Sequence, residues 1–340
     1  MRNPVETPDL YRQSSISQIL SPISEELNTF EEMLLNGLKS GNKLLDRITA
    51  YIISSGGKRI RPALCLLFAK MLSEIETVPK KQFDLAVGLE LMHTATLIHD
   101  DVIDKTEKRR NVVTINKKWD EKTAILAGDY LMSKALGNLS LTKNFDVIDV
   151  FSQMLSEICE GEVSQASAAF EIISLVDCIE KSKRKTANLF AAGVQSAVIL
   201  AGNSDEKELS EAETFAKNFG IAFQLRDDVL NFIAGEEETG KPSGIDLLNG
   251  TVTAPVIYAV EEYEQRGDFT LRTLISSKFK NSEDFWKARN LVFESKSIEK
   301  SKQLIDFYIE SAKQNLSIFP DCNCKRSLLN LCSYLTLCQL

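Results

Sequence analysis

Two aspartates that lie four residues apart, Asp100 and Asp104, form the first group of residues that could do chemistry. They occur in the segment HDDVID within a helical apolar pattern, so their side chains lie one turn apart on one face. Like charges at this spacing favour a cation between them. Carboxylates with no neighbouring cysteine suit Mg²⁺, which takes its other ligands from phosphate and water. The alternative is a solvated acidic turn, and Asp101, about 100° further round the helix, either supports the site or faces solvent.

A second acidic pair, Asp227 and Asp228, occurs in the segment FQLRDDVLN, which has an apolar helical flank of the same kind. Two such acid-rich turns could face each other across a helical bundle and hold metal ions. Both histidines of the chain, His93 and His99, fall in the stretch before the first pair. His93 precedes Asp100 by seven residues and therefore lies on the same face, which favours a functional site over an ordinary core histidine.

Basic side chains accompany both acidic segments. The segment GGKRIRP supplies Lys58, Arg59 and Arg61 after two glycines, which allow the backbone to approach an anion closely. Any one of the basic residues could be a solvated surface charge. Beside Mg²⁺-type carboxylates, however, they indicate one anion held through metal and another held directly, and diphosphates fit both descriptions. The other members of this set are Lys105, Lys108, Arg109, Arg110, Arg184, Lys185 and Lys241.

The composition indicates that long helices carry these groups. The 340 residues include only 16 glycines and 8 prolines, and no strand pattern bounded by hairpin signals is convincing, so the chain is predicted to be all-α. Since no low-complexity linker divides it, we expect one large bundle: an N-terminal extension over 1–24 and a helical domain over 25–340. The periodicity predicts helices over 26–40, 61–73, 83–104, 121–139, 145–171, 178–202, 206–233, 251–265, 282–294, 300–314 and 324–338, and loops over 54–58, 105–114 and 234–250.

The net charge and the cysteines narrow the class of protein. A formal charge of −8 argues against a nucleic-acid binder, which would carry a basic footprint. No apolar window reaches the ~18 residues that span a bilayer, and the N-terminus resembles neither a secretory signal nor an organellar presequence. Seven scattered cysteines fit a reducing compartment, and we predict a cytoplasmic location. The cluster near the C-terminus lacks the spacing of a zinc site and is interpreted as buried thiols: Cys322, Cys324, Cys332 and Cys338.

Five segments of the chain resemble, in order and roughly in spacing, those of the trans-isoprenyl diphosphate synthases: GGKRIRP, MHTATLIHDDVIDKTEKRR, KRKTANLF, FQLRDDVLN and GKPSGIDLLNGTVTAP. The resemblance runs from about residue 25 to the C-terminus. It implies the isoprenoid synthase fold, a large helical bundle around a deep central cavity, usually as a homodimer. It also implies a Mg²⁺-dependent enzyme that elongates an allylic diphosphate with isopentenyl diphosphate.

The same resemblance implies site residues by matching positions. The Mg²⁺ ligands would be Asp100, Asp104 and Asp227. Isopentenyl diphosphate would be bound by Lys58, Arg61, His93 and Arg110. The allylic diphosphate would be bound by Arg109, Lys185, Thr186, Gln224 and Lys241, among which Lys185, Thr186 and Gln224 would take part in catalysis. In the chemistry implied, the allylic diphosphate ionises, isopentenyl diphosphate attacks the allylic cation, and proton loss restores an allylic product, so no nucleophilic side chain is needed.

The chain departs from the usual family pattern at three positions. Asn231 stands where a third aspartate is usual, which keeps an oxygen but removes a charge, so we expect a tuned metal site and not an inactive one. Asn111 and Val113 replace a glycine and a proline that often follow the arginine pair.

Two other functions remain open. A class I terpene cyclase shares the fold and the ionisation step but lacks the isopentenyl diphosphate site, for which Lys58, Arg61 and His93 are present here. A non-catalytic subunit of a heteromeric synthase tends to lose acidic motifs, and Asn231 gives that alternative some weight. Within the synthases, a short-chain enzyme that makes farnesyl or geranylgeranyl diphosphate is the alternative to a long-chain one.

Helix geometry favours the long-chain enzyme. At ~1.5 Å per residue, Ala95 and Thr96 lie roughly 6–8 Å below Asp100, and Met92 lies about one turn further. Short-chain members of the family typically place a bulky aromatic residue at the first of these levels, whereas both residues here are small. We therefore expect a hexaprenyl to decaprenyl product, used as a quinone side chain, and expect Ala95→Phe to shorten it. Another helix could still close the pocket with a bulky side chain, for example Phe151, Phe170 or Phe190.

Overall fold

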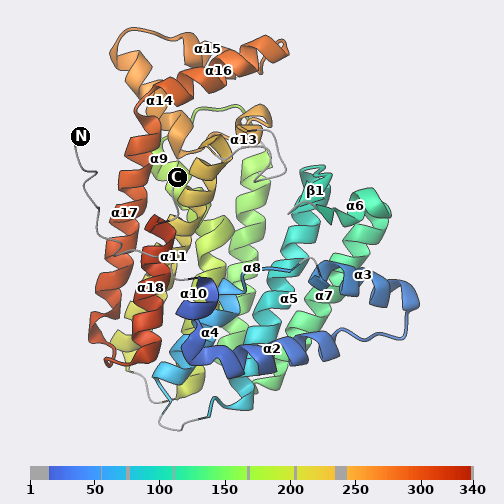
Figure 1. Cartoon of the computed structure of the whole chain (residues 1–340). Coiled ribbons are helices and arrows are strands. Elements are labelled where there is room, and N and C mark those ends of the chain that lie inside the picture. Colours follow the sequence, from blue (N-terminus) through green and yellow to red (C-terminus); the bar gives the residue numbers. More distant parts are fainter. Residues whose placement is uncertain are drawn as a thin grey trace, which may run out of the picture.

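The structure, a computed structural model, describes residues 15–54, 56–73, 77–109, 112–166, 169–202, 205–233 and 243–337. Helices dominate these residues and confirm the all-α prediction (Figure 1). Among the described helices, none is both long and apolar enough to cross a membrane. Those that run along the bundle are α4 (Ile60–Met71), α5 (Lys80–Ile103), α7 (Glu121–Leu141), α8 (Phe145–Ala166), α10 (Asn188–Ala201), α11 (Glu206–Ile233), α17 (Ser297–Asn315) and α18 (Asn323–Leu337).

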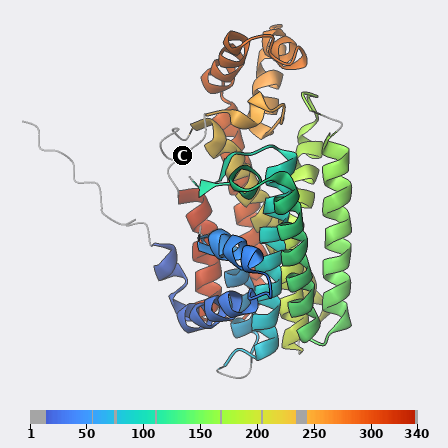
Figure 2. The same ribbon diagram turned by 90° about the vertical axis from the view of Figure 1, so that its right-hand side faces the viewer.

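Shorter helices surround this bundle. Helices α2 (Ser24–Gly37) and α3 (Lys43–Ser54) lie across its outside, and α14 (Ala254–Gln265), α15 (Thr270–Ser276) and α16 (Ser282–Glu294) gather at one end (Figure 1). Figure 2 shows α7 and α8 side by side on one flank. The remaining helical turns are α1 (Ile16–Ile19), η1 (Ser21–Ile23), α6 (Ile115–Lys118), α9 (Leu175–Ser182), η2 (Lys183–Ala187), α13 (Ile245–Leu248) and η3 (Leu316–Ile318).

The structure corrects several of the predicted elements; for example, α15 was not predicted, and α13 lies within the predicted loop over 234–250. Helix α3 was not predicted, although its segment KLLDRITAYIIS buries Ile48 and Ile53 on one side. The helix predicted over 178–202 is helical throughout 178–201, but it contains a π-helical turn, η2, between α9 and α10. The predicted loop over 105–114 contains a small antiparallel hairpin, β1 (Lys108–Arg109) and β2 (Val112–Val113). Two-residue strands are too short to show the alternation that identifies a strand in a sequence.

Helix α5 occupies the middle of the bundle, and its faces contact different neighbours. The face with His99 packs on α7, where a Cβ atom on Gly128 would lie 2.2 Å from His99 Nε2. The face with Leu89 packs on α10, where a Cβ atom on Gly193 would lie 2.5 Å from Leu89 Cδ2. Glycine at these two positions therefore sets how closely α7 and α10 approach. By helical spacing, the α7 face also carries Met92 and Ala95, and the α10 face carries His93, Thr96 and Asp100.

The first and last described helices pack against each other. Ile19, Leu20 and Ile23, from α1 and η1, are buried in the hydrophobic core. The Ser327 hydroxyl of α18 donates a 2.7 Å hydrogen bond to the carbonyl oxygen of Ile19. Residues 16–23 thus take part in the core, while the division of the chain at residue 24 stays a prediction.

Candidate active site

The first acidic motif lies at the C-terminal end of α5, and Lys185 of η2 provides a cation beside it. The Lys185 ammonium lies 3.2 Å from the Glu162 carboxylate of α8 and 4.0 Å from that of Asp100. Burial raises the pKa of Asp100 to about 6; Lys185 opposes this rise, and the carboxylates of Glu162 and Asp104 reinforce it. Burial thus outweighs the nearby cation and disfavours the charged form of Asp100.

The second acidic motif lies near the end of α11. This end and the end of α5 that carries the first motif lie at the same end of the bundle, towards α13 and β1 respectively (Figure 1). Burial raises the pKa of Asp227 to about 6 and that of Asp228 to about 7. The Asp227 side chain is nevertheless 49% exposed, so a ligand can reach it. Asp228 is buried and accepts a 2.8 Å hydrogen bond from the Gln224 amide.

The π-helical turn η2 joins the two motifs. Its Lys185 turns toward the first motif, whereas the hydroxyl of the next residue, Thr186, donates a 2.6 Å hydrogen bond to Gln224 Oε1 on α11. Helix α11 can come this close because of Gly220, where a Cβ atom would lie 2.6 Å from the Ala187 Cα atom. Such turns occur frequently at functional sites. The structure thus brings the Thr186 and Gln224 side chains together, while Lys185 pairs with the first motif, and the shared role of the three residues stays a prediction.

Of the residues predicted to bind isopentenyl diphosphate, Lys58 and Arg61 lie beside the second motif, and His93 contacts Arg61. Arg61 Nη1 lies 3.0 Å from His93 Nε2, and the guanidinium group stacks 4.4 Å from the centre of the Phe190 ring. The Lys58 ammonium donates a 3.3 Å hydrogen bond to the Tyr334 hydroxyl of α18. Both Lys58 and Arg61 lower the pKa of Asp227 against the effect of burial, which places positive charge next to that carboxylate.

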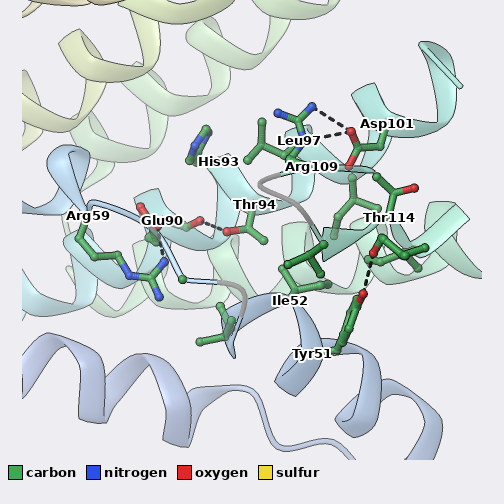
Figure 3. A pocket seen from close by; sticks show the side chains of 16 residues that line it. Tyr51, Ile52, Arg59, Glu90, His93, Thr94, Leu97, Asp101, Arg109 and Thr114 are labelled. Atoms are coloured by element: carbon green, nitrogen blue, oxygen red, sulfur yellow. Dashed lines mark hydrogen bonds and ion pairs between the residues drawn. The ribbon is translucent and has the colours of Figure 1, made fainter. Parts of the chain in front are cut away.

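Arg109 of β1 pairs with Asp101 on a third face of α5, which is turned toward α3 and the hairpin. Its Nε and Nη2 atoms lie 3.0 and 2.9 Å from one carboxylate oxygen of Asp101 (Figure 3). Asp101 is buried, so the alternative that it faces solvent is wrong. The pair lines a cavity of about 80 Å³, which Glu90 and His93 also border. The allylic role of Arg109 stays a prediction, and Arg110 and Lys241 lie outside the described residues.

Asn231 holds a neighbouring loop in place. Its side-chain oxygen accepts a 3.3 Å hydrogen bond from the Asp246 amide, and its carbonyl oxygen accepts a 2.7 Å bond from the Gly244 amide. The Asp246 carboxylate lies close enough to raise the pKa values of Asp227 and Asp228. Asp246 was not predicted to belong to the site, although it occurs in the segment GKPSGIDLLNG, from which only Lys241 was predicted to bind substrate. It could have been found as an acidic residue in a segment that the resemblance already linked to the site.

The donor chemistry of these residues fits a divalent cation such as Mg²⁺. Within the described residues, no three His, Cys, Asp or Glu side chains converge on one point as a complete protein cage would require. Mg²⁺ usually binds through one or two carboxylates and completes its shell with substrate phosphates and water. Burial is the main cause of the raised pKa values of Asp100 and Asp227, and a divalent cation would stabilise the charged form of both carboxylates. Bound Mg²⁺ would therefore be held by Asp100, Asp104 and Asp227.

The residues predicted to set product length divide between two faces of α5. Thr96 shares the face of Asp100, while Met92 and Ala95, both fully buried, turn toward α7. Of the aromatic residues considered as the side chain that closes the pocket, Phe170 contacts Phe279, with ring centres 5.8 Å apart, and its amide donates a 2.9 Å hydrogen bond to the carbonyl oxygen of Gly250, just after α13. It therefore cannot close the opposite end of a pocket. Phe151 and Phe190 are both buried within the bundle.

The interpretation of the C-terminal cysteines as buried thiols is confirmed for two of them, whereas Cys322 is only partly buried. Cys324 and Cys332 are buried in α18, and burial raises their pKa values to about 11 and about 12. Such thiols stay protonated and unreactive at neutral pH. Cys338 lies outside the described residues.

The chain is similar to known proteins over most of its length. The Polyprenyl synthetase family pattern matches residues 42–292. The chain is 40% identical over 293 residues to a decaprenyl-diphosphate synthase of Dictyostelium discoideum, an alignment that covers 86% of this chain and 62% of that protein. It therefore spans less than two thirds of that relative.

Two solved structures share the fold. The heptaprenyl diphosphate synthase of Staphylococcus aureus superposes with a TM-score of 0.87 at 32% identity, covering 92% of this chain and 98% of that one. A polyprenyl synthase of Caulobacter crescentus CB15, complexed with calcium and isoprenyl diphosphate, superposes with a TM-score of 0.88 at 26% identity, covering 96% and 98%. A bundle of this architecture thus accommodates a divalent cation and a diphosphate in the Caulobacter protein.

Proposed function

The chain belongs to the polyprenyl synthetase family, and from this premise we propose that it condenses isopentenyl diphosphate with an allylic diphosphate to make an all-trans polyprenyl diphosphate. We assign it a long-chain product, in the hexaprenyl to decaprenyl range, that serves as a quinone side chain. The names of the similar decaprenyl and heptaprenyl synthases support this length. The small residues Ala95 and Thr96 support it independently.

The main support for the proposal is that one site contains two kinds of group that can bind an anion: carboxylates that could hold a metal ion, and cationic side chains. Lys185 connects the first acidic motif to Glu162, and Thr186 connects η2 to α11 through Gln224. Lys58 and Arg61 stand beside the second motif. One diphosphate can therefore bind near the carboxylates, and another can bind directly to cationic side chains.

The side chains have distinct tasks in the proposed reaction. Mg²⁺, when bound, would neutralise charge on the departing diphosphate. Lys185 binds that diphosphate, and the oxygen atoms of Thr186 and Gln224 present the negative ends of their dipoles to the allylic cation. The hydrogen bonds between Thr186, Gln224 and Asp228 fix these dipoles before the reaction. Lys58, Arg61 and His93 hold isopentenyl diphosphate for attack, and the product loses a proton to the departing diphosphate.

Incorporation of radiolabelled isopentenyl diphosphate by the purified chain tests the function. We expect elongation of a farnesyl or geranylgeranyl diphosphate primer in the presence of Mg²⁺. A terpene cyclase would release diphosphate without incorporating label, and a non-catalytic subunit would do neither until an active partner was added. Either result would contradict the proposal.

We also propose a homodimer and a cytoplasmic location. Helix α7 exposes Ile125, Leu126 and Leu136, which are 46%, 54% and 45% accessible. An apolar row of this kind on an outer helix suits contact with a second copy. Sedimentation equilibrium and cell fractionation test the two proposals.

Substitutions in the two anion sites are expected to separate the substrates. Lys58→Ala or His93→Ala should raise KM for isopentenyl diphosphate at least about tenfold, with a much smaller change for the allylic substrate, because each removes a polar contact to only one diphosphate. Lys185→Ala should show the opposite selectivity. Steady-state kinetics with each substrate varied in turn provides the measurement.

The matched control is Lys313→Ala, which removes a lysine of α17 that forms a 2.7 Å ion pair with nearby Glu310. It should leave both KM values unchanged. Equal effects of the site variants on both substrates would show that the pockets are not divided in this way.

A further inference from the structure

Arg59 has a backbone conformation that is unusual for its residue type. It directly precedes α4 with φ 50° and ψ 31°, in the left-handed region that glycine occupies readily and arginine does not. Residues held in such conformations cluster at binding sites, where the surrounding structure stabilises them. Arg59 lies between Lys58 and Arg61, the two cations of this segment that face the second acidic motif.

The Arg59 side chain makes two short ion pairs with separate helices. Its Nε atom lies 2.7 Å from Glu31 of α2, and its Nη1 atom lies 2.7 Å from Glu90 of α5. The Arg59 and Glu90 side chains are only 13% and 8% exposed, so solvent screens their interaction weakly. Figure 3 shows the two side chains beside each other. Arg59 is thus fixed by contacts outside the candidate active site.

A second contact connects the beginning of α4 to α5, one turn of α5 beyond the Arg59–Glu90 ion pair. Glu90 precedes His93 by one turn of α5, and His93 contacts Arg61 at 3.0 Å. The beginning of α4 is therefore attached to α5 at two successive levels, by Arg59–Glu90 and by Arg61–His93. Only the second link contains residues that the proposed function assigns to isopentenyl diphosphate.

We propose that Arg59 is a positioning residue for the isopentenyl diphosphate site, which its ion pairs with Glu31 and Glu90 hold in shape. The left-handed turn at Arg59 directs Lys58 and Arg61 toward the substrate, and the two glutamates hold that turn. This inference rests on the proposed function. It adds a residue that does not touch substrate, and it assigns the two glutamates a role in substrate affinity.

Two substitutions of Arg59 separate the effect of its backbone conformation from the effect of its side-chain ion pairs. Arg59→Gly permits the left-handed conformation but removes both ion pairs, and Arg59→Lys keeps the charge but cannot reproduce the two-sided contact of a guanidinium group. We expect Arg59→Gly to raise KM for isopentenyl diphosphate by about tenfold or more, because small misplacements of binding groups are costly. KM for the allylic substrate should change by less than about twofold. Arg59→Lys should recover part of the affinity, and Glu90→Gln should resemble Arg59→Gly.

Lys70→Gln is the matched control. Lys70 lies at the other end of α4 and forms a 2.6 Å ion pair with Glu26 of α2, so its loss weakens contact between α4 and α2 without touching the Arg59 turn. It should lower Tm and leave both KM values unchanged. Calorimetric binding of isopentenyl diphosphate to each variant provides a readout that is independent of turnover.

The outcomes distinguish the inference from its premise. Equal affinity of Arg59→Gly and the wild type for isopentenyl diphosphate would overturn the role of Arg59 while leaving the proposed function intact. So would a rise in both KM values that Lys70→Gln reproduces, because that pattern reports general destabilisation. A wild-type chain that neither binds nor incorporates isopentenyl diphosphate would overturn both proposals.

Discussion

Asp100→Ala and Asp227→Ala are each expected to lower turnover by roughly two or more orders of magnitude, because charge on the departing diphosphate would lose its main compensation. Folding should not suffer. The pKa of each carboxyl is raised to about 6 in the folded protein, so its ionisation opposes folding at pH 7, and this penalty disappears below about pH 4, where the group is protonated in both states. The Tm of each variant at pH 7 should therefore equal or exceed that of the wild type.

Steady-state turnover and thermal unfolding, measured on the same preparations, check this expectation. Asp149→Ala is the matched control, because Asp149 is an exposed carboxylate of α8. It should retain full activity. Turnover within a few-fold of wild type in either site variant would remove that residue from the set of metal ligands. A large fall in Tm would instead indicate a structural role.

Thr96→Phe is expected to shorten the product to about farnesyl or geranylgeranyl length without abolishing the first condensation. Thr96 lies one turn before Asp100 on the same face of α5, so a phenyl ring there would occupy the space below the diphosphate. Ala95→Phe should also shorten the product, but less, because Ala95 turns toward α7. Chromatography of the dephosphorylated products provides the measurement.

The two phenylalanine variants serve as controls for each other, since they differ in face and little in added volume. If Ala95→Phe gives the shorter product, the chain grows between α5 and α7 instead of toward α10. A wild-type enzyme that itself stops at farnesyl or geranylgeranyl diphosphate would contradict the long-chain proposal. Phe151 and Phe190, both buried, would then be the first side chains to replace with alanine, to find which one closes the pocket.

Much of the fold could be predicted because its signal is local. The spacing of Asp100 and Asp104 on an apolar helix predicts both the helix and a nearby cation, and Lys185 lies beside Asp100. The pattern of α11 likewise placed Asp227 and Asp228 on a long helix. In each case a helical period of 3.6 residues decides which side chains share a face, and neighbours far along the chain are not needed.

What the sequence did not reveal depends on contacts between distant segments. No residue type in its sequence identifies the π-helical turn η2, which lies where α11 approaches closely at Gly220. The pairing of Arg109 with Asp101 depends on a hairpin too short to leave a pattern. Asp246 reaches the second motif because Asn231 binds its loop, which spacing along the chain does not encode.

The contact between Lys58 and Tyr334 has a consequence for how the protein is made. The two residues are 276 positions apart, and a ribosome that adds 5–20 residues per second needs roughly 14–55 s to travel between them. During that interval the GGKRIRP segment has emerged while its last neighbour is still unmade, and α1 likewise waits for Ser327. The nascent chain must therefore leave the faces of α1 and α4 that contact α18 uncovered until residues 327 and 334 have been made, which lengthens the time in which chaperones can bind them.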